Sequence, residues 1–300
     1  MKGDRIEQVG TTILSDRHCH LGEGCTYDRR TDTAWWFDIL ERTLFEADLG
    51  SGAVTAHALP RMASVLAYID DAHQLLAMED GLYVRDVVDG RLALHTPLEA
   101  DKAATRSNDG RVHPCGALWI GTMGCKAEMG AGAIYHFHRG ALRRLYANIS
   151  IPNAICFSPD GATAYFTDSR EGILYRVAVD PATALPSGNP ATLYDHRGGA
   201  GALDGAVVDR EGLIWNARWG GSCIDVYTPE GNRVRTIAVP ATQPSCPVFV
   251  GQEFDRLLLT SAWEGMDEPA RAADPHHGKT FILDVGARGQ AEPRVRLGPA

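Results

Sequence analysis

The four residues WWFD at 35–38 introduce the pattern that decides the fold, because a short apolar run of this kind returns five more times. The later runs are LLAM at 75–78, LWIG at 118–121, YFTD at 165–168, IWNA at 214–217 and LLLT at 257–260. Successive runs begin 40 to 49 residues apart. A feature that recurs at such intervals is typical of a repeat protein. The 300 residues therefore divide into six units.

Strand and turn signals surround each run. In the fourth unit, the strand-like stretch AICF at 154–157 leads into the turn SPDG at 158–161, so the unit opens with a β-hairpin. More β-rich sequence follows the runs, and no segment keeps a 3.6-residue apolar period over the length of a helix. Units of this size with about four strands each predict an all-β, six-bladed β-propeller that forms a single domain over residues 1–300. The alternative, a pair of β-sandwiches, does not require one evenly spaced run six times.

Composition and charge exclude several classes of function. The chain is 44% hydrophobic and 22% charged, the balance of a protein with a packed core. No segment is apolar enough for a membrane span or a signal peptide, so we expect a cytoplasmic location. The net charge is −9 without a cluster of Lys and Arg, so neither a nucleic acid nor a membrane is an expected partner. Seven cysteines without a CxxC pair predict reduced thiols, and no obligate protein partner is evident.

Four polar residues lie at similar distances before the apolar runs. Glu23 and Asn153 precede their runs by 12 residues, and Asn108 and Asp204 precede theirs by 10. The innermost strand of each propeller blade starts near the mouth of the central channel, so we expect these side chains to converge there at one shared position. Carboxylate and amide oxygens suit Ca²⁺, Mg²⁺ or Mn²⁺, which predicts an open metal site in the central channel. The alternative is that these residues only cap turns.

Five longer stretches contain these residues and most of the runs. They are LGEG at 21–24, RSNDGRVHPCGALWIGTM at 106–123, IPNAICFSPDGATAYFTDS at 151–169, LDGAVVDREGLIWNARWGG at 203–221, and SCPVFV with LLLTSAWEGM at 245–250 and 257–266. In sequence and in order they resemble the signature segments of the gluconolactonase/regucalcin family, the senescence marker proteins. The resemblance covers nearly the whole chain. It implies a six-bladed propeller that binds one divalent cation in its channel, and hydrolysis of aldonolactones, which several members catalyse.

The resemblance also implies roles for individual residues. Glu23 of LGEG, Asn153 after the Ile-Pro pair and Asp204 of LDG correspond to metal ligands. Arg106 and Asn108 are similar to the residues that hold the hydroxyl groups of the sugar. The implied cofactor is one divalent metal ion, Ca²⁺ in first place, with Mg²⁺, Mn²⁺, Zn²⁺ or Fe²⁺ as alternatives.

The sequence departs from the family pattern at three places. The family often has a proline after LGEG, where this chain has Cys25, and SNG where this chain has Pro152, Asn153 and Ala154. Some members place a substrate-contacting glutamate three residues after GTM, where this chain has Lys126, with Glu128 two residues further on. Glu128 is therefore a candidate substrate-binding residue. The stretch 121–137 is closer to bacterial pentonolactone or hexonolactone hydrolases than to the animal proteins.

These residues suit the hydrolysis of an ester. A divalent cation polarises the lactone carbonyl and stabilises the oxyanion, and Asp204 is the best candidate for the base that activates water. The sequence therefore predicts a metal-dependent lactonase of carbohydrate metabolism, which converts a sugar lactone to the aldonic acid. A non-catalytic calcium-binding propeller is the alternative, and a propeller that docks other proteins is a third.

Other candidate residues carry weaker signals. His18 and His20 have the spacing of a metal-binding pair, but alternate residues of a strand share one face for ordinary structural reasons. Trp263 follows the last apolar run and is a candidate for the mouth of the channel. The sequence contains no GxSxG motif, so no serine is indicated as a nucleophile.

Overall fold

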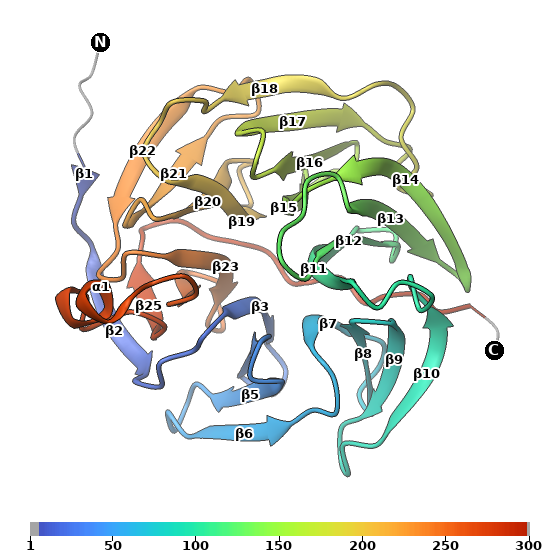
Figure 1. Ribbon diagram of the computed structural model, residues 1–300, viewed down its shortest axis with the longest axis horizontal. Coiled ribbons are helices and arrows are strands. Elements are labelled where there is room, and N and C mark those ends of the chain that lie inside the picture. The colour runs from blue at the N-terminus through green and yellow to red at the C-terminus, as the bar shows by residue number, and fades with distance from the viewer. Residues whose placement is uncertain (1–5, 299–300) are drawn as a thin grey trace. The chain divides into compact units, whose positions relative to one another are not determined.

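Six β-sheets follow one another along the chain, one for each repeat (Figure 1). The computed structural model describes residues 6–298. The strands within each sheet are antiparallel, apart from one short parallel strand added to the edge of one sheet. The fold is an all-β, six-bladed β-propeller, which confirms the prediction from the repeats. By their contacts the residues form two compact units, Met1–Ala58 with His196–Ala291 and Leu59–Asp195 with Glu292–Ala300. The single domain over residues 1–300 stays a prediction.

The first unit contains three sheets. One is made of β3 (Gly22–Asp28), β4 (Thr33–Asp38), β5 (Thr43–Asp48) and β6 (Val54–Ala58). The next is made of β19 (Ala202–Val208), β20 (Ile214–Trp219), β21 (Cys223–Tyr227) and β22 (Arg233–Ala238), with β1 (Ile6–Glu7) parallel to β22. The third is made of β23 (Pro244–Val250), β24 (Arg256–Ser261), β25 (Thr280–Asp284) and β2 (Gly10–Ser15).

The second unit contains the other three sheets. The first is made of β7 (Ala63–Tyr68), β8 (His73–Met78), β9 (Gly81–Asp86) and β10 (Leu92–Pro97). The second is made of β11 (Thr105–Val112), β12 (Leu118–Gly124), β13 (Gly132–His138) and β14 (Ala141–Ile149). The third is made of β15 (Pro152–Phe157), β16 (Thr163–Asp168), β17 (Ile173–Ala178) and β18 (Ala191–Asp195).

Strand β2 departs from the simple order of the repeats. The last repeat supplies only three strands, and β2, from the start of the chain, pairs antiparallel with β25 as the fourth. This pairing covers the backbone edge that β25 would otherwise expose. The six units therefore do not fill the chain in order, because residues 10–15 belong to the last blade.

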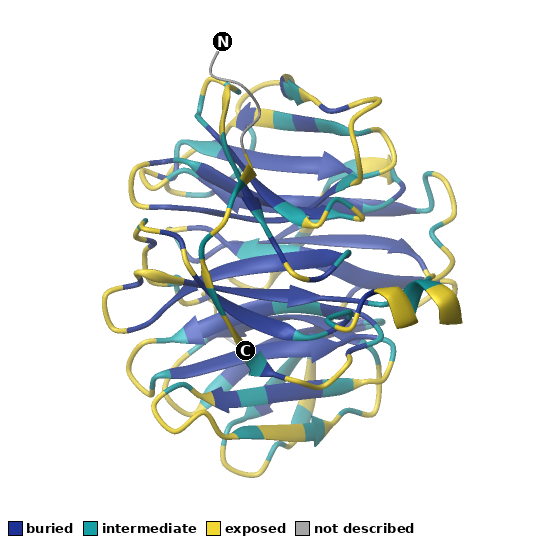
Figure 2. Ribbon diagram, turned by 90° about the vertical axis from the view of Figure 1, so that its left-hand side faces the viewer, coloured by how far each residue is buried: buried dark blue, intermediate teal, exposed yellow. Residues whose placement is uncertain are grey.

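The six apolar runs lie in the second strand of each sheet. All six residues of β4 are buried, and so are all seven of β12. These strands have a neighbour on each side, and a strand that is buried on both faces reads as a continuous apolar run. The outermost strands β6 and β10 are mostly exposed or half-buried. Figure 2 shows this gradient from dark blue strands to yellow edges and turns.

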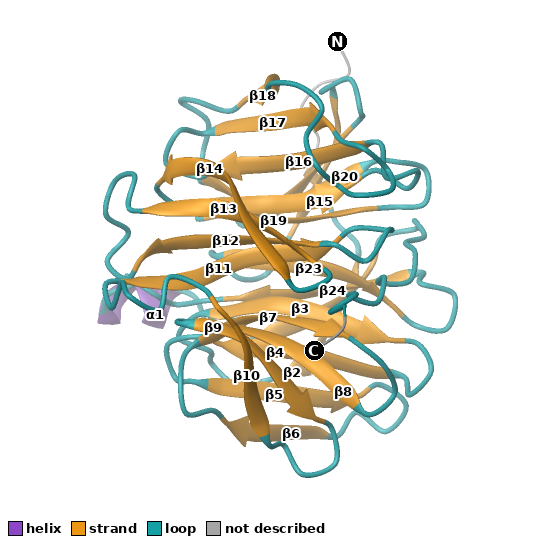
Figure 3. Ribbon diagram, turned by 90° about the vertical axis from the view of Figure 1, so that its right-hand side faces the viewer, coloured by secondary structure: helices purple, strands orange, loops and turns teal. Residues whose placement is uncertain are grey.

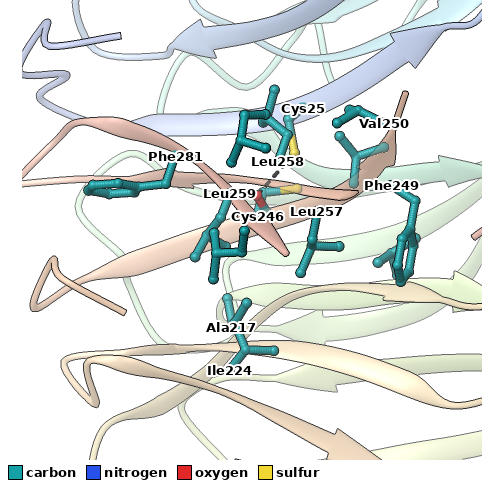
Figure 4. Close-up of a cluster of buried hydrophobic side chains, with 14 of the residues drawn as sticks. Cys25, Ala217, Ile224, Cys246, Phe249, Val250, Leu257, Leu258, Leu259 and Phe281 are labelled. Atoms are coloured by element: carbon teal, nitrogen blue, oxygen red, sulfur yellow. Dashed lines mark hydrogen bonds between the residues drawn. The ribbon is translucent and has the colours of Figure 1, made fainter. Parts of the chain in front are cut away.

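A large apolar cluster holds the first unit together (Figure 4). Leu257, Leu258 and Leu259 of β24 are fully buried in it. The thiol of Cys25 on β3 donates a hydrogen bond to the carbonyl oxygen of Cys246 on β23, at 3.0 Å. None of the seven cysteines forms a disulfide bond in residues 6–298.

One short helix, α1 (Glu268–Ala273), interrupts the strands of the first unit (Figure 3). The side chain of Asp267 caps it by accepting a hydrogen bond from the backbone N–H of Ala270 at 2.9 Å. Within residues 6–298, no helix is both long enough and apolar enough to cross a membrane.

Tryptophan residues on the second strands fill the centre of three sheets. Trp36, Trp119 and Trp215 are fully buried. The indole N–H of Trp119 donates to the carbonyl oxygen of Ala184 at 3.0 Å, and its ring meets the ring of Phe157 edge-on at 5.5 Å. The ring of Trp119 thus combines a large buried area with a satisfied polar group.

Replacement of Trp119 by alanine removes this packing, so we expect Trp119→Ala to lower the free energy of unfolding by about 3–5 kcal/mol. Chemical denaturation measures the change. The exposed Val88 serves as control, since Val88→Ala should change the free energy by less than about 0.5 kcal/mol. Equal effects of the two substitutions would contradict the assignment of Trp119 to the core.

His113 connects two turns of the second unit. Its Nδ1 accepts a hydrogen bond from the backbone N–H of Cys115 at 3.0 Å, and its Nε2 donates to the carbonyl oxygen of Gly161 at 2.9 Å. Only a neutral imidazole can make both bonds. Burial lowers the pKa of His113 below its usual value, because it disfavours the charged form.

This lowered pKa predicts a loss of stability in acid. As the pH falls through the usual histidine pKa of about 6.5, the unfolded chain takes up a proton that folded His113 does not. The free energy of unfolding should therefore fall between about pH 7.5 and about pH 5.5. In His113→Gln, which cannot titrate, the fall should be smaller. Denaturant titrations at both pH values test this, and equal falls in the two proteins would rule it out.

Candidate functional site

Every sheet has a break in the register between its first and second strands. In β3, Glu23 pairs with Phe37 and Thr26 pairs with Trp35, so one extra residue lies between the two pairs. Equivalent breaks lie between Ala63 and Val65, Ser107 and Gly110, Asn153 and Cys156, Leu203 and Ala206, and Pro244 and Pro247. Such β-bulges re-aim side chains and are common next to active sites. All four predicted polar residues lie at these bulges.

The four residues do not share a single position, and this corrects the expectation from the spacing. Glu23 and Asn153 are the last paired residues before their bulges, whereas Asn108 and Asp204 are the first residues inside theirs. The apolar runs misled the alignment because they begin at different points of the second strand.

The backbone after Glu23 and Asn153 is left-handed. Gly24 has a φ of 60°, and Ala154 has a φ of 54°. Glycine adopts this conformation without strain, and alanine adopts it at a cost. The geometry therefore explains why a glycine suits this position, and it places backbone strain directly after Asn153, where this chain has Ala154 instead.

In the second unit, a chain of hydrogen bonds brings three of the predicted residues together. Nη1 of Arg106 donates to Oδ1 of Asn108 at 2.8 Å. Nδ2 of Asn108 donates to Oδ1 of Asn153 at 3.0 Å and to the carbonyl oxygen of Pro152 at 2.9 Å. Arg106, Asn108 and Asn153 are all buried. Each carboxamide is therefore held in one orientation.

Ser169 completes this chain, and the sequence analysis did not single it out. Its Oγ accepts a hydrogen bond from Nδ2 of Asn153 at 2.9 Å. This bond fixes the amide nitrogen of Asn153, and Oδ1 retains a lone pair beyond the one that Asn108 uses. The available signal was the serine that directly follows the run YFTD, at the end of the stretch 151–169.

Glu128 lies apart from this chain. It is exposed in the loop after β12, and its Oε2 accepts a hydrogen bond from the backbone N–H of Lys126 at 3.0 Å. The guanidinium of Arg170 fastens the same loop by donating to the carbonyl oxygen of Ala127 at 2.9 Å. A role of Glu128 in substrate binding stays a prediction.

In the first unit, Glu23 and Asp204 lie on two strands that both pack against β23. Asp204 is only 4% exposed. Glu23 is half-buried, and its Oε2 accepts a hydrogen bond from the backbone N–H of Gly24 at 3.2 Å. A metal-binding role of Glu23, Asn153 and Asp204 stays a prediction.

Serines lie in the two bulges that hold none of the four predicted polar residues. The hydroxyl of Ser245 on β23 donates to the carbonyl oxygen of Gly22, directly before Glu23. The hydroxyl of Ser64 on β7 donates to Oγ of Ser107 at 2.8 Å and also contacts the carbonyl oxygen of Asn108. These serines satisfy backbone groups beside a neighbouring bulge.

Two aspartates anchor the chain just before Glu23 and Asn153. Asp38 closes β4, and its carboxylate accepts hydrogen bonds from the backbone N–H groups of His20 and Leu21, at 2.8 and 3.1 Å. Asp168 closes β16 and accepts from Ser150 at 2.6 Å, as well as from Ile151 and Arg170. Burial raises the pKa of Asp38, while these backbone donors act against the rise.

Asp109 connects two first strands of the second unit. Its Oδ2 accepts a hydrogen bond from the backbone N–H of Ile155 at 2.7 Å, and its Oδ1 accepts from Gly110 at 2.8 Å. Burial raises the pKa of Asp109 to about 6, against the opposing charge of Arg111. Asp109 therefore fixes the bulge of β11 beside that of β15.

His18 and His20 bind different partners. The ring of His20 stacks on Trp263 at 3.8 Å, and its Nδ1 lies 3.2 Å from Oε1 of Glu41. Nδ1 of His18 lies 2.6 Å from the carbonyl oxygen of His277. In the described part of the chain, no three His, Cys, Asp or Glu side chains lie close enough to hold a metal ion. Trp263 packs against the segment that leads into β3.

The Asp168 anchor yields a prediction. An asparagine has a single acceptor oxygen, so Asp168→Asn cannot satisfy all three backbone donors. We expect the free energy of unfolding to fall by about 1.5–3 kcal/mol, as for the loss of a hydrogen bond to a charged group. Asp160→Asn, in an exposed turn that suits asparagine, is the matched control and should change it by less than about 0.5 kcal/mol. Similar melting curves for both variants would refute the anchor.

Comparisons with known proteins agree with this architecture. The family model described as "SMP-30/Gluconolactonase/LRE-like region" matches residues 21–263. A Rhizobium meliloti protein named "Putative sugar lactone lactonase" is 58% identical over 98% of this chain and 99% of its own length. L-arabinolactonase from Azospirillum brasilense is 34% identical over 94% of both chains.

A solved structure extends the agreement to three dimensions. Regucalcin from Agrobacterium tumefaciens, described as a calcium-binding protein, is 51% identical and superposes with a TM-score of 0.96 over 97% of this chain and 99% of its own. The resemblance stated from the signature segments is therefore confirmed, and the chain belongs to the SMP-30/gluconolactonase/LRE-like family.

Proposed function

We propose that this chain hydrolyses a sugar lactone to the aldonic acid with one divalent metal ion, held in the central channel, as cofactor. The observation that carries the proposal is the buried carboxylate of Asp204 at a β-bulge, in a chain whose relatives bear lactonase names. The prediction of a lactonase-type enzyme is confirmed by those relatives. The expected partner is therefore a small-molecule sugar lactone. The cytoplasmic location and the exclusion of nucleic-acid, membrane and protein partners stay predictions.

The donor groups present fit a hard divalent cation. Glu23 and Asp204 offer carboxylate oxygens, and Asn153 offers an amide oxygen whose orientation Ser169 and Asn108 fix. Oxygen donors of this kind suit Ca²⁺, Mg²⁺ or Mn²⁺. A carboxylate as buried as that of Asp204 also gains from a neighbouring positive charge. Ca²⁺ is the first candidate because the Agrobacterium regucalcin is described as calcium-binding; Mg²⁺, Mn²⁺, Zn²⁺ and Fe²⁺ are alternatives.

The residues of this chain then take distinct roles. When bound, the cation supplies Lewis-acid polarisation of the lactone carbonyl. Asp204 accepts a proton from the attacking water at its carboxylate. The guanidinium of Arg106 donates a hydrogen bond to a sugar hydroxyl, and Oδ1 of Asn108, which has a second lone pair, accepts a hydrogen bond from a hydroxyl group. Glu128, on the loop after β12, contacts the outer part of the sugar.

Metal dependence is the first test of the proposal. We expect the purified protein to release acid from a lactone above the spontaneous rate, to lose this activity after treatment with a chelator, and to regain it when a divalent cation is restored. Titration of acid release on gluconolactone, xylonolactone, arabinonolactone and galactonolactone, with Ca²⁺, Mg²⁺, Mn²⁺ or Zn²⁺, measures it. The absence of turnover on every combination would refute the proposal.

Removal of the base is the second test. Asp204→Asn keeps the shape of the side chain but cannot take up the proton, so we expect kcat to fall by about 10²–10⁴-fold. Asp160→Asn, in an exposed turn, should leave kcat unchanged. An active Asp204→Asn protein would show that another group activates the water.

A non-catalytic calcium-binding propeller is the second candidate, favoured by the description of the Agrobacterium regucalcin. It predicts that Ca²⁺ raises the melting temperature of the wild-type protein, because a ligand that binds only the folded state stabilises it. It also predicts no lactone turnover under any condition. The hydrolase predicts the same stabilisation together with turnover, so the two measurements distinguish these functions.

A further inference from the structure

We propose that Asn216 is a positioning residue that holds the bulge of β19 and thereby fixes the carboxylate of Asp204. This inference deepens the proposed function and rests on the role given there to Asp204. Asn216 lies on β20, opposite Ala206, and it is fully buried. It does not belong to the predicted ligands or substrate contacts.

The side chain of Asn216 supplies hydrogen bonds that the bulge removes. Between the pairs of Leu203 and Ala206, the ladder between β19 and β20 is interrupted. Nδ2 of Asn216 donates to the carbonyl oxygen of Asp204 at 2.7 Å and to that of Gly205 at 3.2 Å. Buried carbonyl groups need such partners. One side chain therefore satisfies both peptide carbonyls within the bulge.

The orientation of this amide is fixed. A rotation by 180° would bring Oδ1 of Asn216 against the carbonyl oxygens of Asp204 and Gly205, and the two acceptors would repel each other. Within residues 6–298, Oδ1 is buried and has no hydrogen-bond partner. The hydrogen bonds of the side chain thus all go to the bulge. Asn216 therefore leaves its own Oδ1 unsatisfied while its Nδ2 supports the bulge. A buried polar group kept at this cost points to a functional role for the bulge.

The opposite side of the bulge is also confined. A Cβ atom built on Gly205 would lie 2.7 Å from the carbonyl oxygen of Ser245 and 3.0 Å from Cα of Cys246, so β19 and β23 approach closely there. The bulge is held by Asn216 from β20 and by the backbone of β23. A carboxylate that acts as ligand and base needs such support, because small shifts in its position reduce binding and catalysis.

The bulge of β23 is supported in a similar way. The hydroxyl of Thr260 on β24 donates to the carbonyl oxygen of Cys246 and accepts from its N–H, both at 3.1 Å.

His136 on β13 in the second unit provides the control, because no metal or substrate role is assigned to it and it lies outside the bulges between first and second strands. It is buried, and its Nε2 donates to the carbonyl oxygen of Thr183 at 2.7 Å. His136→Leu therefore removes a comparable hydrogen bond from a side chain to a backbone carbonyl.

The experiment compares Asn216→Leu, which has a similar volume and no donor, with His136→Leu. Hydrogen–deuterium exchange should become faster over residues 202–208 in Asn216→Leu and around Thr183 in His136→Leu. Calorimetry with Ca²⁺ alone should show affinity weakened about 10- to 100-fold only in Asn216→Leu. Lactone assays should show kcat reduced by a similar factor in that variant, with little change in KM. Asn216→Ala is the second variant, with the same expected direction, if the leucine prevents folding.

Three outcomes separate this inference from the proposed function. Unchanged exchange over 202–208 in Asn216→Leu and Asn216→Ala would overturn the support of the bulge. If hydrogen–deuterium exchange over 202–208 becomes faster in Asn216→Leu while Ca²⁺ affinity and kcat stay at the wild-type values, Asn216 does not position Asp204. If the wild-type protein turns over no lactone, the proposed function fails, but weakened Ca²⁺ binding in Asn216→Leu still supports the positioning role.

Discussion

The bulge in the first strand of each sheet is the constraint on which the rest of the structure depends. An antiparallel pair satisfies its backbone groups through a regular ladder, and each bulge leaves peptide groups that need other partners. Asn216, Thr260 and Ser64 supply these partners from neighbouring strands. The polar residues around the bulges are therefore part of the fold as well as of the candidate site.

The bulges divide the candidate residues into two kinds of position. Glu23 and Asn153 lie just before their bulges, and in both sheets an aspartate at the end of the second strand fastens the preceding backbone. Asp204 lies inside its bulge and depends instead on the amide of Asn216. Two kinds of support therefore hold residues that the sequence analysis expected at one shared position. A substitution at either kind of support acts on the site without touching a substrate.

The sequence predicts the architecture well because the burial of a strand determines which of its residues are apolar. A strand covered on both faces must be apolar throughout, so WWFD at 35–38 and its counterparts reveal the six sheets. The register of the hydrogen bonds between strands does not determine residue type in this way. The spacings of 12 residues for Glu23 and 10 for Asp204 did not reveal that one lies before its bulge and the other inside it. They also gave no sign that Ser169 would bind Asn153. The sequence did not reveal the fourth strand of the last sheet, because that strand, β2, precedes the first apolar run.

The pairing of β2 with β25 affects how the chain is made. Strand β2 is made before β3, yet it completes a sheet whose other three strands, β23, β24 and β25, come after those of every other sheet. The other five sheets can form their antiparallel strands as the chain is made, while this sheet must wait until β25 has been translated. Its closure joins residues of very large sequence separation, a contact that is slow to form. A circular permutant that begins at β3 and carries β2 after β25 would make the four antiparallel strands of every sheet from consecutive sequence.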